Sequence, residues 1–323
     1  MDLNRVSNEE LIREIKGDKN RADSGYMGLS EFTKTISELI LSSLGEGFKV
    51  SSKEIIKNNG VVYHALLISK EGRSIAPTIY IDQFYEVYKN GMPLKKVVME
   101  ILTMYRNSMP KTDLDMDFFF DFSKVSDKLF FKVVNFEKNK KKLENVPYRK
   151  LMDMAMVPLC RMKNEVLGEG VITIDNDHLK SWEISEDELW ENIGEHAGSV
   201  APPKITGLVD FLERMAGQRL DMGPLCGIRV VTNTSGNLGA SAAFYPGVLE
   251  ELADDMQSDL YIIPSSVHET LVIPDPELEM DVECLKDMIH EVNSTTVAEE
   301  EVLSDNLYRY DRESGKLFVV KAS

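Results

Sequence analysis

The stretch that decides the fold runs from Asp259 to Pro274 and reads DLYIIPSSVHETLVIP. Two apolar runs, residues 259–264 and 268–274, flank a turn that begins with Ser265 and Ser266. Short apolar runs on both sides of a polar turn are typical of paired β-strands. A helical pattern follows over residues 282–292, so this stretch predicts a β-hairpin that leads into a helix.

The same order of elements is expected at two earlier places in the chain. Residues 154–195 contain apolar runs at 154–162 and 171–174, and a capping box, Ser185 to Glu188, begins the helix that follows. Residues 228–257 are interpreted as a strand, a turn at Ser235, a second strand at 240–245 and a helix from Pro246. We expect the tyrosine-rich hairpin at about 307–321 to add strands to the C-terminal sheet.

The N-terminal half is richer in helical patterns. Asn58-Asn59-Gly60 lies between two alternating runs and predicts a β-hairpin, and residues 113–143 are expected to form one or two helices. The predicted fold class is therefore α+β, with a helix-rich N-terminal half that contains a β-hairpin. Repeated β-hairpin–helix units follow it and form mainly antiparallel sheets.

The predicted domain organisation has four parts. Residues 1–28 are expected to be a flexible tail, and residues 29–197 an N-terminal α+β domain. Residues 198–226 are expected to form a linker with a short helix and a hinge at Pro202-Pro203. Residues 227–323 are then the C-terminal α+β domain.

Charge is unevenly distributed along the 323 residues, whose formal net charge is -17. Residues 1–150 carry 25 basic and 21 acidic side chains, whereas residues 151–323 carry 12 and 33. The acidic half would repel a nucleic-acid backbone. No stretch reaches the roughly 20 apolar residues that span a bilayer, so we expect a cytoplasmic protein without membrane contact. The spacing of Cys160, Cys226 and Cys284 fits reduced thiols, and we expect no cofactor.

Several segments resemble an uncharacterised domain-of-unknown-function family of Firmicute bacteria, often encoded on integrative and mobile elements. The segments are residues 76–82, 136–140, 244–250, 259–269, 290–293 and 302–311, and the likeness extends from residue 29 to the end. Residues 176–182 with the following helix are also similar to a second widespread uncharacterised bacterial family. Neither resemblance implies an activity.

The turn after residue 264 holds a candidate catalytic group, Ser266 and His268, beside Glu269. A hydrolase needs a nucleophile hydrogen-bonded to a base that a third group orients. In a strand, Ser266 and His268 would share a face while Glu269 points away, which does not build a triad. A polar binding rim is the favoured interpretation, with the candidate residues Ser265, Ser266, His268, Tyr245, Tyr308, Arg309 and Tyr310.

Asp175, Asp177 and His178 are the candidate metal ligands. An Asx turn that leads out of a strand explains the same residues without a metal, so no metal site is predicted. The alternating Asp113, Asp115 and Asp117 lack the glycine and the glutamate of a calcium loop.

The basic cluster of the chain comprises Lys138, Lys140, Lys141, Lys142, Arg149 and Lys150. A solvated helix end accounts for such a run, and nucleic-acid contact is the alternative. No aromatic residue is interleaved with the lysines of the run 138–142 to stack on bases.

The leading functional hypothesis is a non-enzymatic cytoplasmic interaction module of mobile-element biology, with an unidentified protein partner. One alternative is a hydrolase or metal-assisted enzyme that uses Ser266 and His268, or Asp175 and His178. A second alternative is nucleic-acid binding through residues 138–150.

Overall fold

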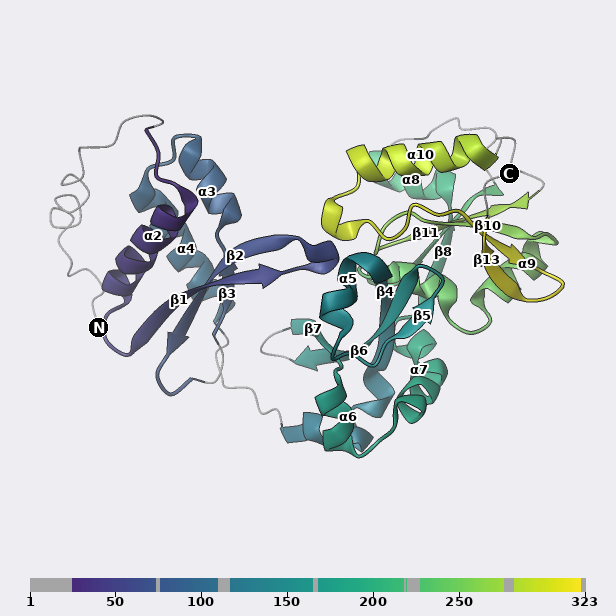
Figure 1. Ribbon diagram of the computed structural model, residues 1–323, viewed down its shortest axis with the longest axis horizontal. Helices are drawn as coiled ribbons and strands as arrows, with labels where there is room; N and C mark the ends of the chain where they lie inside the picture. Colours follow the sequence, from purple (N-terminus) through teal and green to yellow (C-terminus); the bar gives the residue numbers. More distant parts are fainter. Residues whose placement is uncertain are drawn as a thin grey trace. The chain divides into compact units, whose positions relative to one another are not determined.

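The computed structural model describes residues 25–73, 76–109, 117–164, 168–217, 219, 227–275 and 282–320. Contacts divide the chain into two units, drawn in Figure 1. The first comprises Met1–Ile56 and Val62–Leu114, and the second comprises Lys57–Val61 and Asp115–Ser323. This division differs from the predicted one, which placed the boundary within residues 198–226.

The first unit packs helices on a three-stranded antiparallel sheet of order β1-β2-β3. Its elements are α2 (Leu29–Leu44), β1 (Phe48–Ile56), β2 (Val62–Lys70), β3 (Thr78–Tyr80), α3 (Asp82–Lys89) and α4 (Leu94–Ser108). The predicted β1–β2 hairpin is confirmed, with Ile56 opposite Val62 and Asn59 in the left-handed region at φ 58°. Its turn, residues 57–61, groups with the second unit.

Part of the predicted tail belongs to the first unit. The main-chain oxygen of Met27 accepts a hydrogen bond from the Tyr85 hydroxyl at 3.0 Å, and the Met27 N–H donates to Tyr88 at 3.2 Å. Tyr26 packs edge-on against Tyr88. Residues 1–24 lie outside the described residues.

The second unit contains a four-stranded sheet in which β6 (Met154–Asn164) pairs with β4, β5 and β7. The other elements of this layer are β4 (Leu129–Asn135), α5 (Phe136–Leu143), β5 (Arg149–Leu151), β7 (Gly168–Thr173), α6 (Asn176–Trp182) and α7 (Glu186–Val200). The capping box of Ser185 and Glu188 is confirmed. The prediction of helices alone over residues 113–143 is wrong, because the run LFFKVVN forms β4 and is buried among apolar neighbours. A short apolar run of this kind fits a buried strand and a buried helix equally well.

A six-stranded antiparallel sheet completes the second unit, with strand order β13-β12-β10-β11-β9-β8. The strands are β8 (Pro203–Gly207), β9 (Arg229–Asn233), β10 (Leu260–Pro264), β11 (Thr270–Pro274), β12 (Tyr308–Asp311) and β13 (Lys316–Val319). The β10–β11 hairpin and the added C-terminal strands are confirmed. Pro203 begins an edge strand where a hinge was expected, a position that tolerates proline.

The helices of this layer are α8 (Leu208–Ala216), α9 (Val248–Met256) and α10 (Val282–Thr295). The strand expected at residues 240–245 is wrong, because Gly239–Phe244 forms a 3₁₀ helix, η6. Its residues 239–243 are small and fully buried, so η6 fits a narrow space against β9 and β11. A Cβ at Gly239 would lie 2.2 Å from Thr232 Oγ1 and 2.7 Å from the His268 oxygen.

The core of the second unit lies between its two sheets and is filled from both, by residues such as Phe131, Leu159, Trp190, Val231, Ile262, Val272 and Tyr308. Leu285 and Ile289 of α10 cover the opposite face of the six-stranded sheet. Leu143 of α5 packs on the four-stranded sheet with Val134, Ala155 and Val157. The α+β class is confirmed. Within the described ranges, no helix is both long enough and apolar enough to cross a membrane.

Candidate functional site

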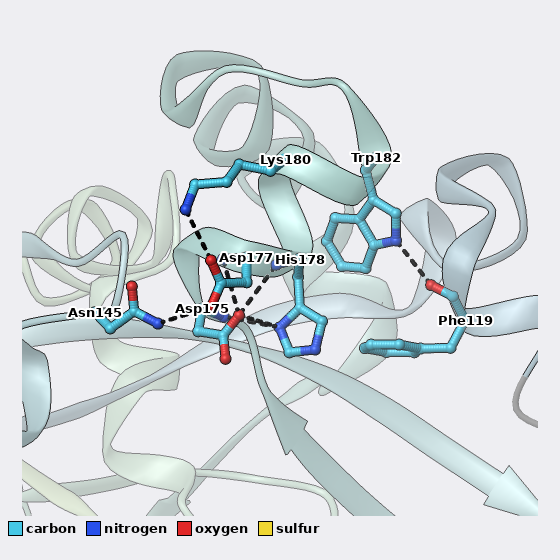
Figure 2. A network of polar contacts seen from close by, with 7 residues as sticks. All are labelled: Phe119, Asn145, Asp175, Asp177, His178, Lys180 and Trp182. Carbon is cyan, nitrogen blue, oxygen red and sulfur yellow. Dashed lines mark hydrogen bonds and ion pairs between the residues drawn. The ribbon is translucent and has the colours of Figure 1, made fainter.

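Asp175 and His178 begin helix α6 and bind each other's main chain (Figure 2). Asp175 Oδ1 accepts the N–H groups of Asp177 and His178 at 3.1 and 3.0 Å, and the Asp175 N–H donates to His178 Nδ1 at 3.0 Å. This reciprocal pattern is a capping box, which satisfies the free N–H groups of the first helical turn. Asp177 instead pairs with Lys180 at 2.8 Å, and that hydrogen bond lowers the pKa of the Asp177 carboxyl.

The His178 ring is held by aromatic side chains. It stands edge-on to Phe119 and stacks on Trp182, with ring centroids 5.1 and 5.8 Å apart, and Trp182 Nε1 donates to the Phe119 oxygen. Nδ1 of the ring also lies 2.8 Å from Asp175 Oδ1. In the described parts of the chain, no group of three or more His, Cys, Asp or Glu side chains could hold a metal ion. Asp113 and Asp115 lie outside those parts.

The turn from Ser265 to Glu269 uses its polar groups within itself. Ser266 Oγ donates to Glu269 Oε1 at 2.7 Å and accepts the His268 N–H at 3.0 Å. The serine is therefore bonded to the carboxylate and not to the imidazole ring. The described geometry lacks the nucleophile–base hydrogen bond on which serine activation depends.

The His268 ring joins this turn to two other segments. Its Nδ1 accepts the Leu238 N–H at 3.2 Å, and its Nε2 lies 3.4 Å from Glu301 Oε1. The His268 oxygen accepts the Thr232 hydroxyl at 2.7 Å, next to the close approach of Gly239. The ring nitrogens thus join the turn to Leu238, just before η6, and to Glu301, and the main-chain oxygen of His268 joins it to β9.

The four remaining candidates for the binding rim lie elsewhere. Tyr245, Tyr308 and Tyr310 are buried in the core of the second unit, and burial raises the pKa of each hydroxyl. Arg309 points to the other face of β12, where its guanidinium pairs with Asp259 at 2.8 Å and Asp275 at 2.7 Å. The structure therefore brings none of these four to the Ser265–Glu269 turn.

The basic cluster lies on α5 and β5 and contains aromatic rings that its sequence order does not reveal. Lys150 Nζ lies 4.4 Å from the centre of the Phe136 ring, and Lys140 Nζ lies 5.5 Å from it. Tyr148 packs against Phe136, with ring centroids 5.6 Å apart. We call this set the α5–β5 surface: Phe136, Lys138, Lys140, Lys141, Tyr148, Arg149 and Lys150.

Two members of this surface also form ion pairs. Lys140 pairs with Glu137 at 2.5 Å, and Arg149 pairs with Asp187 at 3.0 Å while it lies over the Trp190 ring. Their side chains stay 57% and 43% exposed, so both cations remain open to a partner. Exposed pairs of this kind are worth about 0–1 kcal/mol and give way to a better partner.

A buried polar network around Asp153 was not found by sequence reasoning. Its carboxylate accepts hydrogen bonds from Ser304 at 2.7 Å, from Asn306 at 2.9 Å and from the Tyr308 hydroxyl. The network joins the β5–β6 turn to the segment before β12, over about 150 residues of sequence. A single aspartate in a turn carries no signal in the sequence that would identify this role.

Lys132 was also missed, although a sequence signal existed. It is the one charged residue within the apolar run LFFKVVN of β4. Burial, followed by the charges of Lys142 and Lys57, lowers the pKa of Lys132 to about 8. A charge inside an otherwise apolar strand is the pattern that could have pointed to it.

Comparison with curated proteins gave no match, and comparison with solved structures gave none either. A family model described as a family of unknown function, DUF5688, matches residues 29–312. The match includes the whole of α2 to β11, α10 and β12, and with them every candidate residue discussed above. The chain therefore belongs to the DUF5688 family of unknown function.

Proposed function

We propose that this protein is a non-enzymatic interaction module that binds an acidic protein segment through the α5–β5 surface. The observation that carries the proposal is the Phe136 ring, which has the ammonium groups of Lys150 and Lys140 within 4.4 and 5.5 Å. An aromatic side chain beside exposed cations offers apolar contact and positive charge in one place. Aromatic residues and arginine are enriched at interfaces, and this surface holds Phe136, Tyr148 and Arg149.

The non-enzymatic part of the proposal is supported by the bonds that the candidate catalytic groups make within the fold. Ser266 is bonded to Glu269, and His268 is bonded to Leu238 and faces Glu301. Asp175 and His178 cap α6. Each candidate therefore has a local role in the fold, and catalysis would require that role to be given up.

The same geometry favours a protein partner over a nucleic acid. Base stacking needs an open ring face, and the ammonium groups of Lys140 and Lys150 already lie over Phe136. An acidic peptide places its carboxylates near the cations without a base to stack.

The test compares two charge reversals in the purified full chain used as bait. One variant carries Lys140→Glu, Lys141→Glu and Lys150→Glu, and the matched control carries Lys49→Glu, Lys53→Glu and Lys96→Glu in the first unit. All six lysines are exposed. We expect one partner of acidic composition to be retained by the wild type and the control and lost by the first variant.

The response of a captured partner to salt and to nuclease treatment distinguishes an acidic protein from a nucleic acid. Binding between exposed charges weakens as the Debye length falls from about 10 Å at 0.1 M to about 3 Å at 1 M. A capture that nuclease treatment abolishes would support the nucleic-acid alternative. Capture that neither salt nor the first variant reduces would remove the α5–β5 surface from consideration.

We place this function in the cytoplasm of a Firmicute bacterium and in the biology of integrative mobile elements. The support is the resemblance of residues such as 259–269 and 302–311 to a family with that distribution. The genes on either side of family members test it: a proposal of this kind fails if those genes are ordinary chromosomal ones with no integrase or conjugation gene among them.

A further inference from the structure

The three-stranded sheet of the first unit packs its helices on one of its two faces. Side chains alternate along a strand, and those of Val50, Leu66 and Ile79 belong to the apolar cluster that α2, α3 and α4 complete. The residues between them point to the other face of the sheet. The apolar residues of that other face are not part of the cluster; they are Ile55, Tyr63, Ala65, Leu67 and Tyr80.

The pairing of β1, β2 and β3 sets the order of the side chains on this second face. Lys53 lies opposite Ala65, which in turn lies opposite Tyr80. Residues directly opposite each other share a face, and so do residues two apart along one strand. We call the resulting set the β1–β3 face: Lys49, Ser51, Lys53, Ile55, Tyr63, Ala65, Leu67, Ser69, Thr78 and Tyr80.

Two tyrosine rings lie together on the β1–β3 face. The rings of Tyr63 and Tyr80 meet edge-on, with centroids 5.5 Å apart, and both side chains are half-buried. Ala65 lies between Lys53 and Tyr80, so its small side chain leaves the longer ones to form the surface. Sheets that bind single-stranded nucleic acid present aromatic side chains in this way, and the bases stack on them.

The charged residues of the β1–β3 face are all lysines. Lys49 and Lys53 are exposed, and none of the residues of this face is acidic. Glu54 of the same strand points to the other face. Residues 25–109 carry 10 basic and 8 acidic side chains, so this part of the chain lacks the acidic excess of residues 151–323. The charge of the face therefore complements a phosphate backbone.

Two hydroxyl groups complete the polar part of the β1–β3 face. Ser51 and Thr78 lie on either side of Leu67, since both are paired with it. Within the ranges that the structure describes, neither hydroxyl has a hydrogen bond. A hydroxyl both donates and accepts, which suits the ribose 2′-hydroxyl that distinguishes RNA from DNA.

We propose that the β1–β3 face binds single-stranded RNA. The two tyrosine rings stack on bases, Lys49 and Lys53 contact phosphates, and the hydroxyls of Ser51 and Thr78 bind ribose. The face belongs to the first unit and the α5–β5 surface to the second. Substitutions on one leave the other unchanged, so this proposal does not depend on the proposed function.

The experiment measures fluorescence anisotropy of labelled octauridylate with the purified full chain in about 50 mM salt. Stacking on aromatic rings tolerates any base, so a uniform sequence is a suitable probe. We expect the double variant Lys49→Gln and Lys53→Gln to bind about tenfold or more weakly. The slope of log Kd against log salt concentration should fall by about 1.4 in this variant, because each phosphate contact of a single strand contributes about 0.7.

The matched control is the double variant Lys34→Gln and Lys96→Gln. These two lysines are exposed on α2 and α4, so the control removes the same charge from the helices of the same unit. We expect it to keep the wild-type affinity and the wild-type salt slope. RNA binding that both double variants weaken equally would overturn the proposal, because net charge alone would then explain it.

The rings are tested by Tyr63→Leu and Tyr80→Leu, each of which should weaken binding about tenfold or more. Tyr63→Phe and Tyr80→Phe keep the ring faces and should bind like the wild type. Thermal unfolding without RNA shows whether each variant folds. The lysine variants change exposed positions, so they test the face even where a leucine variant does not fold.

The corresponding deoxyuridine octamer tests the assignment to RNA. We expect the full chain to bind octauridylate about threefold or more tightly than this DNA. The double variant Ser51→Ala and Thr78→Val should remove the difference. Equal wild-type affinities for the RNA and the DNA would overturn the proposal, and so would the absence of RNA binding at about 100 μM protein.

Discussion

The Ser265–Glu269 turn and the lysines around Lys132 are both polar regions of the second unit, but they differ in how their polar groups are satisfied. In the turn, Ser266 and His268 each have partners from the chain itself. The side chains of Lys132 and Lys142 have no such partner among the described residues. The residue types that suggest catalysis thus have structural roles, whereas Lys132 is a charged side chain on a strand whose neighbours are apolar.

The largest expected effect on stability tests how tightly the chain is packed around the Ser265–Glu269 turn. Gly239→Ala places a Cβ 2.6 Å from the Asn233 nitrogen and 2.7 Å from the His268 oxygen, and both are main-chain atoms that cannot swing away. We expect a loss of about 3 kcal/mol or more in the free energy of unfolding, measured by urea denaturation. Gly198→Ala is the control, because nothing lies within 4 Å and alanine suits a helix. A tolerant Gly239→Ala would mean that the turn is loosely held.

The next effect tests the environment of Lys132 through the pH dependence of the free energy of unfolding. The pKa of Lys132 is lowered to about 8 in the folded chain, so the unfolded chain binds more protons between about pH 8 and pH 10.5. The free energy of unfolding should therefore rise with pH through this window. The destabilisation by the charged Lys132 is fully present below pH 8. The difference in the free energy of unfolding between the wild type and Lys132→Met isolates the contribution of Lys132, because both proteins contain the tyrosines that titrate in the same pH range.

At neutral pH, Lys132→Met should stabilise the fold by about 2 kcal/mol, after allowance for the part of the side chain that solvent reaches. Chemical denaturation at pH 7 and pH 10 gives both numbers. A difference between the two proteins that does not change with pH would mean that Lys132 is well solvated.

Ser266→Ala has a smaller expected effect. It removes the donor to Glu269 and the acceptor of the His268 N–H, so two half-buried partners lose one hydrogen bond each. We expect a loss of about 1–2 kcal/mol, measured by the same denaturation. Ser265→Ala should change stability by less than about 0.5 kcal/mol. Equal effects of the two substitutions would contradict the hydrogen bonds described here.

The smallest effect concerns the edge of the turn. Glu301 faces His268 at 3.4 Å from a side chain that is 40% exposed. Glu301→Gln keeps an acceptor oxygen at the same place and should change stability by less than about 0.5 kcal/mol, like Glu251→Gln on α9. A loss above about 1 kcal/mol would show that the contact between Glu301 and His268 stabilises the fold more than an exposed pair does.

Sequence patterns predicted the elements that carry their own local signal. The Asn58–Gly60 hairpin, the Ser185 capping box and the β10–β11 hairpin each depend on residues close together in the chain. Strand β4 and the 3₁₀ helix η6 were missed because distant contacts decide them. β4 is a strand since β6 pairs along its whole length, and η6 is compact since β9 and β11 leave it no room.

The candidate site follows the same rule. The acidic and basic halves, the Lys138–Lys150 cluster and the absence of a triad in the turn could be argued from sequence. The position of Phe136 beneath Lys150 could not, because the two residues meet only through the pairing of β5 with β6. The meeting of Asn59 with Asn139 of α5 depends on hydrogen bonds between residues that are 80 positions apart.

The turn of residues 57–61 also determines when the second unit can be completed during synthesis. Asn59 Nδ2 donates to the main-chain oxygens of Glu299 and Val302, which are made 240 and 243 residues later. At about 5–20 residues per second, the ribosome delivers these acceptors roughly 10–50 s after the turn has been translated. The turn must therefore wait, with its amide groups in water, until the last segment of the chain emerges. A nascent chain stopped before residue 299 would keep this turn open to protease, and release of the finished chain would close it.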